Sequence, residues 1–204
     1  RYKIAFKFEG EIKETVINAI EWQISRFGIY TPVAILNPVE IKGAIINKVT
    51  LHNKQLVETY QIKIGDRIKL IRSGEVIPKF IGVVQSSNNR LEIPKKCYHC
   101  DSKLEHDEVR LMCTNKKCAG RALEDIIQFA KKINIEDLSE KRIEQMIKAK
   151  LVSSVSDLFK LNQSSLLKLE GFKDTLTNKI LINIEKSKEL SIINFFDALG
   201  FTGG

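Results

Sequence analysis

All four cysteines of this 204-residue chain lie within a window of 22 residues. They form two close pairs, C-x2-C and C-x4-C, separated by twelve residues: Cys97, Cys100, Cys113 and Cys118. Two such pairs, each on a tight turn, are typical of a tetrahedral zinc site with four cysteine ligands. We therefore predict a structural zinc site, because four thiolates leave no open position on the metal for catalysis.

Other roles for these cysteines agree less well with the pattern. Disulfides are not needed in a chain long enough to bury a core, and four free buried thiols would not explain the pairing. The chain opens at Arg1 without an apolar signal segment, although a leader removed from a longer protein would leave the same start. His99 and His106 are alternative ligands, but His99 lies inside the first turn and is expected to face solvent.

The charge of the chain favours an anionic partner. The formal net charge is +8, and residues 1–94 carry 14 Lys and Arg against 9 Asp and Glu, an excess of +5. Nucleic acid is preferred over a membrane, because there is no basic amphipathic helix with a strong apolar face. No apolar run is long enough to cross a bilayer. The Lys-rich, Ile-rich and cysteine-poor composition predicts an intracellular protein.

The pattern before Pro94 predicts short β-strands. Apolar and polar residues alternate over residues 2–8, and β-branched runs follow at 33–36, 44–46, 49–51, 67–72 and 77–84. About five short strands suit a small β-barrel, with an OB-fold as the leading option.

The apolar period changes to 3.6 residues after Cys118, which predicts helices. Residues 123, 126, 127 and 130 share one helical face, as do 143, 146 and 147. Capping residues predict further helices after Ser154, after Asn162, from Asp174 to about residue 190, and over 192–199 up to Gly200.

One stretch of the helical half suggests a contact with DNA. Residues 167–174, Leu-Lys-Leu-Glu-Gly-Phe-Lys-Asp, are typical of a helix-hairpin-helix, in which the N–H groups of Gly171 and Lys173 and the next helix N-terminus face a phosphate. An ordinary helical hairpin with a glycine C-cap is the alternative. Further copies are predicted at 133–141 and from Asp197 to the chain end.

With these parts in this order, the chain resembles the C-terminal half of bacterial-type NAD-dependent DNA ligases. The most similar stretches include Thr-Leu-His-Asn at 50–53, Arg-Ser-Gly-Glu-Val-Ile-Pro at 72–78 and Leu-Glu-Gly-Phe at 169–172. The resemblance implies a multidomain α+β protein. Its parts would be the last strand of the adenylylation domain (1–9), an OB-fold β-barrel (10–94), a small four-cysteine zinc finger (95–120) and an all-α helix-hairpin-helix domain (121–204).

The resemblance also implies roles for single residues. Lys7 occupies the position of a lysine near the AMP phosphate, and Arg26 matches the arginine of a Gly-Arg-Thr-Gly turn of which the first Gly and the Thr are changed here. Arg72 precedes the family's Ala-Gly-Asp-Val-Ile-Pro, and Val76 and Ile77 match the apolar pair that enters the minor groove beside the nick. By their sequence alone, these would be surface cations and core residues.

Two departures from the family pattern have consequences. The first hairpin has Asp137-Leu138-Ser139 in place of Gly-Leu-Gly, so we expect it to bind DNA poorly. The K-x-D-G motif with the adenylylated lysine is absent from these residues, so the fragment is expected to be inactive alone.

The leading hypothesis is therefore the DNA-binding portion of an NAD-dependent DNA ligase that seals nicked duplex DNA. It would be a monomer in the bacterial cytosol, or a viral protein in an infected cell. Structural zinc would bind here, while NAD and Mg²⁺ would serve the full-length enzyme. A non-catalytic OB-fold and zinc-ribbon module that binds nucleic acid, and a zinc-stapled scaffold that binds protein, are the alternatives.

Overall fold

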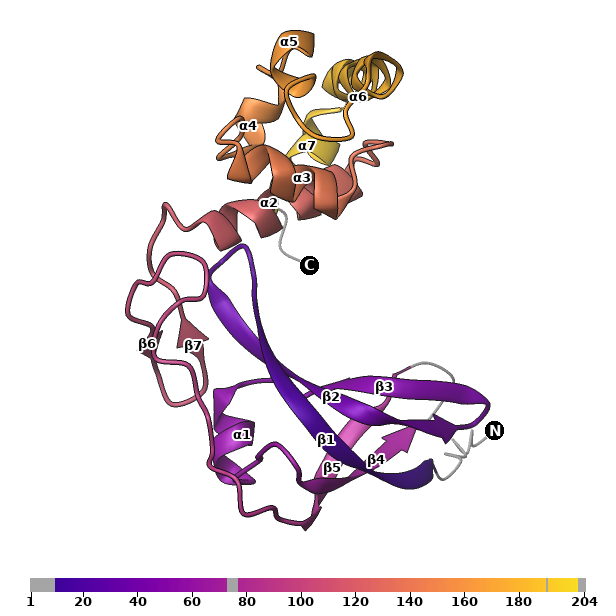
Figure 1. Cartoon of the computed structure of the whole chain (residues 1–204), viewed down its shortest axis with the longest axis vertical. Coiled ribbons are helices and arrows are strands. Elements are labelled where there is room, and N and C mark those ends of the chain that lie inside the picture. The colour runs from indigo at the N-terminus through magenta and orange to yellow at the C-terminus, as the bar shows by residue number, and fades with distance from the viewer. Residues whose placement is uncertain (1–9, 73–76, 190, 202–204) are drawn as a thin grey trace, which may run out of the picture. The chain divides into compact units, whose positions relative to one another are not determined.

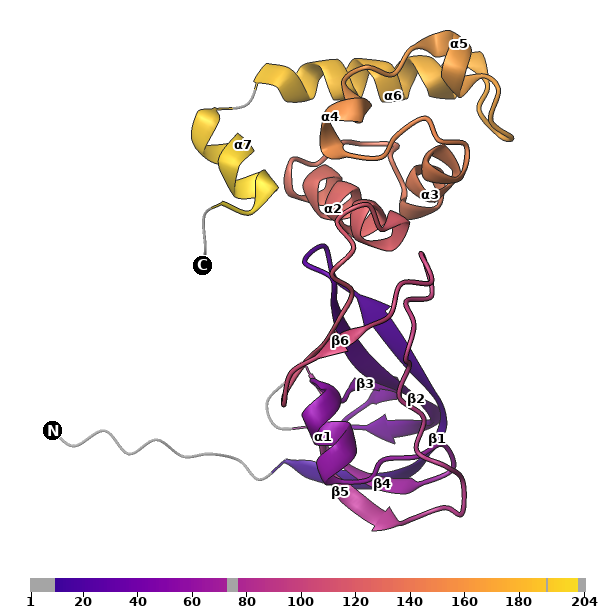
Figure 2. The same ribbon diagram turned by 90° about the vertical axis from the view of Figure 1, so that its left-hand side faces the viewer.

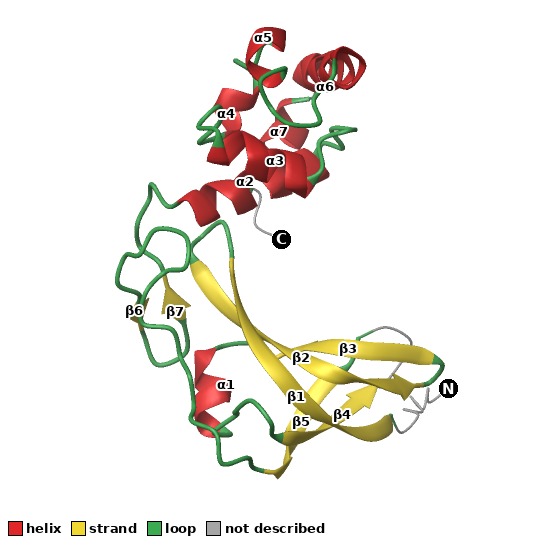
Figure 3. Cartoon of the chain, in the orientation of Figure 1, coloured by secondary structure: helices red, strands yellow, loops and turns green. Residues whose placement is uncertain are grey.

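The computed structural model describes residues 10–72, 77–189 and 191–201, which form two compact units. The strand unit comprises residues 10–23, Ile29–Cys97 and Asp101–Thr114. The helical unit comprises Ile24–Gly28, Tyr98–Cys100 and the residues from Asn115 onward. Figure 3 shows that the strands belong to the first unit and that, apart from one short helix, the helices belong to the second.

The strand unit is built on a twisted sheet in which the paired strands run antiparallel (Figure 1). The strand order is β5-β4-β1-β2-β7-β6, and β3 pairs with β2 beside this path. The strands are β1 (Glu11–Ile24), β2 (Ile29–Ile41), β3 (Ala44–Thr50), β4 (Arg67–Arg72), β5 (Lys79–Gln85), β6 (Glu105–His106) and β7 (Leu111–Met112).

The two longest strands bury their side chains in different ways. In β2 every second residue from Tyr30 to Leu36 is buried, as expected for a strand with one face on the core. In β1 the buried positions are Thr15 and Ile17 in the first half but Trp22 and Ile24 in the second half. The buried side of β1 therefore changes from odd to even positions along the strand.

A short helix and a buried carboxylate close the core of the strand unit. Helix α1 (Lys54–Thr59) begins at Asn53, whose side-chain oxygen accepts a hydrogen bond of 2.9 Å from the N–H of Leu56. Asp66 is fully buried before β4, and its carboxylate accepts hydrogen bonds from the N–H groups of Lys63 (2.8 Å) and Ser87 (2.6 Å). Asp66 thus ties the turn before β4 to the segment after β5.

The helical unit packs its helices around one apolar cluster (Figure 2). Phe129 is fully buried there, and its ring meets Phe159 and Phe195 edge-on at centroid distances of 6.1 and 6.0 Å. The helices are α2 (Ala119–Lys132), α3 (Glu140–Lys148), α4 (Val155–Leu158), α5 (Gln163–Leu166), α6 (Asp174–Lys186), the 3₁₀ turn η1 (Ser187–Glu189) and α7 (Ile192–Leu199).

Most of the predicted elements are present, with some different boundaries. The predicted strand over 33–36 is the centre of the longer β2, and the runs at 44–46 and 49–51 join in a single strand, β3. The predicted helix from Asp174 to about residue 190 ends at Lys186 and continues as η1. Strand β1 and helix α1 had not been predicted, and the predicted strand over residues 2–8 lies outside the described residues.

The apolar cluster of the helical unit predicts a large effect for one isoleucine. Ile126 is fully buried on α2, so Ile126→Ala should lower the free energy of unfolding by about 2–5 kcal/mol. Ile182 on α6 is 53% exposed, so Ile182→Ala should change it by less than about 0.5 kcal/mol. Urea unfolding followed by far-ultraviolet circular dichroism would measure both, and equal effects would contradict the assigned core.

Candidate metal centre and nucleic-acid interface

The four cysteines converge in the structure. Their sulfur atoms all lie within 4.8 Å of one another. Three of the residues are buried and Cys100 is half-buried, so the thiols are largely shielded from solvent.

Backbone hydrogen bonds hold each cysteine pair on a turn. The N–H of Asp101 donates to the carbonyl of Cys97 at 3.0 Å, and the N–H of Cys97 donates to Ser102 at 2.9 Å. In the second pair, the N–H of Cys118 donates to the carbonyl of Asn115 at 3.2 Å, and Cys118 is also the N-cap of α2. The two tight turns expected from the spacing are therefore both formed.

The donor set fits a tetrahedral metal ion such as zinc. A zinc–sulfur distance of about 2.3 Å places tetrahedral sulfur ligands about 3.8 Å apart, which falls inside the 4.8 Å within which all four sulfurs lie. The hydroxyl of Tyr30 lies 3.2 Å from the sulfur of Cys97 and donates to it, as second-layer groups do to metal thiolates. His99 and His106 lie outside this cluster; both are exposed, as expected for His99, whose ring lies beside Gly120.

The candidate phosphate-binding hairpin lies between α5 and α6. Gly171 has a left-handed backbone, with φ of +81°, so another residue would be strained there. Phe172 next to it is 5% exposed and anchors the turn in the apolar cluster, while Lys173 is exposed and is the N-cap of α6. The first helical residue, Asp174, accepts a hydrogen bond of 3.1 Å from the side chain of Gln163. A phosphate approaching this end would therefore meet Lys173 and one carboxylate.

The other predicted hairpin has a different arrangement. Asp137 has a left-handed backbone with φ of +62°, and its carbonyl accepts a hydrogen bond of 2.5 Å from the guanidinium of Arg142. Ser139 is the N-cap of α3, but its hydroxyl makes no capping hydrogen bond. The weak DNA binding expected of this segment stays a prediction.

Arg72 supports the turn between β2 and β3. Its Nη1 donates to the carbonyl oxygens of Ile41 (2.9 Å) and Lys42 (3.2 Å). Its cross-strand partner Glu11 accepts a hydrogen bond of 3.0 Å from the N–H of Lys42. Hydrogen bonds from the side chain of Lys13 and from the backbone of Lys42 hold the pKa of Glu11 below its usual value. Arg72 and Glu11, which pair across β4 and β1, therefore both form hydrogen bonds with the turn between β2 and β3.

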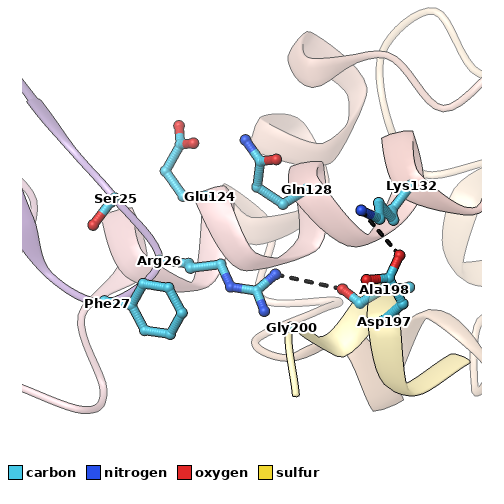
Figure 4. A pocket seen from close by; sticks show the side chains of 9 residues that line it. All are labelled: Ser25, Arg26, Phe27, Glu124, Gln128, Lys132, Asp197, Ala198 and Gly200. Atoms are coloured by element: carbon cyan, nitrogen blue, oxygen red, sulfur yellow. Dashed lines mark hydrogen bonds and ion pairs between the residues drawn. The ribbon is translucent and has the colours of Figure 1, made fainter. Parts of the chain in front are cut away.

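Arg26 lies in a turn that is grouped with the helical unit. The turn ends at Gly28, which has φ of +84° and donates its N–H to the carbonyl of Ser25 at 2.8 Å. The guanidinium of Arg26 donates to backbone carbonyl oxygens at the end of α7, and Figure 4 shows it pointing toward that helix end. The structure thus gives Arg26 protein partners at the atoms for which a phosphate contact had been expected.

Comparison with known proteins bears on both units. The family model of the NAD-dependent DNA ligase OB-fold domain matches residues 14–92, which run from within β1 to beyond the end of β5. A DNA ligase of Helicobacter pylori strain Shi470 is 40% identical over 206 residues, which cover 98% of this chain and 31% of that protein. A DNA ligase of Wolinella succinogenes is 39% identical over 206 residues (98% and 32%), and one of Lactobacillus gasseri is 37% identical over 199 residues (94% and 30%).

The chain belongs to the NAD-dependent DNA ligase family. It spans about a third of the length of these relatives. The resemblance proposed from the sequence is therefore confirmed, and the matched domain confirms the OB-fold of the strand unit. The four-cysteine cluster fits the zinc finger that the ligase resemblance implied.

The structure describes some of the predicted ligase site residues and not others. Lys7 and Val76 lie outside the described residues, so their roles remain predictions. Ile77 is described and is 63% exposed, so it is available for contact. Sequence reasoning missed the hydrogen bond from Tyr30 to Cys97, because the two residues are far apart in the chain and no motif joins them.

The cysteine cluster makes a direct prediction about metal content. The purified protein should carry one zinc per chain, and Cys113→Ser should lose it, because three thiolates bind zinc far less tightly than four. Plasma mass spectrometry gives the metal content, and circular dichroism with added chelator shows the structural effect. Thr114→Ser, an exposed neighbour, is the matched control and should keep its zinc. Protein purified without chelator and found free of zinc would contradict this site.

Proposed function

We propose that this chain is the DNA-binding portion of an enzyme that joins a 3′-hydroxyl to a 5′-phosphate in nicked duplex DNA. The observation that carries the proposal is the ligase OB-fold domain at residues 14–92, inside a chain that matches DNA ligases over almost its whole length. A non-catalytic nucleic-acid-binding module had been the alternative, and the names of these relatives favour the ligase.

These residues bind the substrate and leave the first chemical step to other parts of the enzyme. The 204 residues contain no K-x-D-G, so the lysine that becomes adenylylated lies elsewhere in the whole protein. NAD would supply the adenylyl group and Mg²⁺ would balance phosphate charge in that whole protein. Lys7, at the position of the lysine beside AMP, would stabilise negative charge on the phosphate but not act as the nucleophile.

The proposed DNA contacts divide into cations and apolar groups. Lys173 is exposed beside the left-handed turn at Gly171, which suits a phosphate contact without base recognition. Ile77, 63% exposed, would press with Val76 into the minor groove, where an apolar side chain has favourable contacts. Arg72 would add a positive charge beside the backbone while supporting the turn after β2.

The remaining parts of the proposal concern support and setting. Zinc on the four cysteines would be structural, because all four positions are taken by sulfur. The helices from Ala119 onward would form a helix-hairpin-helix domain that follows the DNA backbone. The described residues contain no helix that is both long and apolar enough to span a membrane. We place the enzyme, as a monomer, with the bacterial nucleoid in the cytosol.

The absence of K-x-D-G from this chain predicts that the chain cannot form the covalent adenylate. The purified chain should not become covalently labelled by radioactive NAD or ATP on a denaturing gel, because it lacks the lysine that forms the adenylate. In a gel-shift at low salt with zinc present, it should still bind a nicked duplex weakly, since the contacts of the rest of the enzyme are absent. A covalent label would contradict the assigned split, and no shift at low salt would contradict the DNA-binding role.

The hairpin contact predicts a change in salt dependence. Lys173→Ala should weaken binding to every duplex sequence equally and lower the slope of log K against log salt by about one unit, because one phosphate contact is lost. Lys179→Ala is the matched control, since Lys179 is also an exposed lysine on α6 but lies away from the turn. Anisotropy titrations between low and moderate salt would measure both slopes. Equal slopes in the two variants would remove Lys173 from the proposed interface.

A further inference from the structure

Arg26 is surrounded by hydrogen-bond acceptors within the helical unit. It lines a cavity of about 350 Å³ beside α2 and α7 (Figure 4). Only 13% of its side chain is exposed. Its Nη1 donates to the carbonyl of Ala198 at 3.4 Å, its Nη2 donates to the carbonyl of Leu199, and its Nε lies 3.7 Å from a carboxylate oxygen of Asp125.

These acceptors resemble what a phosphate would offer. Ala198 and Leu199 carry the last carbonyl groups of α7, where the helix dipole places partial negative charge. Together with the carboxylate of Asp125 they present three oxygens to one guanidinium, as a phosphate group does. The donors of the Arg26 guanidinium are therefore engaged by oxygens of the kind that a phosphate would offer.

Asp197, which lines the same cavity as Arg26, has a different ion-pair partner. The carboxylate of Asp197 forms an ion pair of 2.9 Å with Lys132. Figure 4 shows this pair beside the contact that Arg26 makes with α7. Asp125 and Asp197 therefore carry equal charge near Arg26, but only Asp125 forms an ion pair with it among the described residues.

The end of α7 leaves no space for a side chain beside the guanidinium. Gly200 is the C-cap of α7 with φ of +79°, a left-handed conformation. A Cβ at this position would overlap the guanidinium of Arg26. Even an alanine at position 200 would therefore displace Arg26 from these carbonyls.

The backbone of the turn has a separate attachment. The side chain of Arg121 on α2 donates to the carbonyl of Arg26 at 3.3 Å. The ring of Phe27, which is 65% exposed, lies 5.2 Å from the guanidinium carbon. The guanidinium can therefore leave the carbonyls of α7 while Arg121 still holds the turn.

Two of the three contacts of the Arg26 guanidinium are long, and only the contact with the carbonyl of Leu199 is close. A hydrogen bond of 3.4 Å is at the outer limit for this type of contact, and the 3.7 Å pair involves a partner whose side chain is 41% exposed. An ion pair this long with an exposed carboxylate contributes little to stability. Charge-assisted bonds from arginine to phosphate are shorter, about 2.7–2.9 Å, and are often bidentate.

We propose that the end of α7, with Asp125, is an internal competitor for Arg26, so that DNA binding must first release this arginine from the carbonyls of Ala198 and Leu199. The inference rests on the proposed function and on the phosphate contact that the ligase resemblance implies for Arg26, because it needs a DNA phosphate as the second partner. Only the released fraction of molecules binds with full strength, so the apparent affinity falls in proportion to that fraction.

The test compares matched acidic residues in the zinc-loaded chain. Asp125→Ala removes one acceptor of Arg26, while Asp197→Ala removes the same charge from the wall of the cavity beside Arg26 and leaves the ion pair of Arg26 with Asp125 in place. Binding to a labelled nicked duplex by anisotropy should be about five-fold tighter for Asp125→Ala than for Asp197→Ala. Gly200→Ala, which displaces the guanidinium sterically, should also bind more tightly than the unchanged chain. Circular dichroism would confirm that each variant is folded.

The same acidic substitutions in an Arg26→Ala variant test whether their effects depend on Arg26. Arg26→Ala should weaken binding and lower the salt slope by about one unit. In that background, Asp125→Ala and Asp197→Ala should have equal effects, because no guanidinium is left to release. Equal effects in the original background, an Asp125 advantage that persists without Arg26, or an unchanged salt slope in Arg26→Ala would each overturn the inference. Failure of the unchanged chain to bind at low salt would instead reject the proposed DNA-binding role.

Discussion

The convergence of four thiols is the constraint on which the segment from residue 95 to residue 118 depends. Its strands, β6 and β7, are only two residues long, and most of its side chains are exposed. Ordering this stretch costs about 1–2 kcal/mol per residue in backbone entropy, which so few apolar contacts offset poorly. Bonds from the four sulfurs to a metal ion would be strong enough to offset this cost, so the cysteines would specify the local fold more than the residues between them do.

The parts that sequence analysis predicted well were those with a local signal. The cysteine spacing predicted both turns, the 3.6-residue period predicted α2 and α3, and Gly200 was expected to end the last helix. Family motifs added the OB-fold, which strand patterns alone had left as a leading option. Each of these signals is contained within about twenty residues, so neighbouring positions were enough to reveal it.

The parts that were missed depend on distant residues. Strand β1 was not predicted because its buried side changes between Ile17 and Trp22, which breaks the period of two. Arg26 was assigned to DNA by its motif alone, and only the structure shows the carbonyls at the end of α7 beside it. No pattern in the sequence relates residue 26 to residues 198 and 199, because that relation exists only after folding.

The change of buried side in β1 has a consequence for how this domain varies among relatives. A regular strand with one buried face accepts polar residues at every second position along its whole length. Here the positions open to solvent are even numbers such as Glu14 and Asn18 in the first half, and odd numbers such as Glu21 and Gln23 in the second. A one-residue deletion between Ile17 and Trp22 would move every side chain of the second half to the opposite face of the sheet. The middle of β1 should therefore keep its length even where its residues change freely.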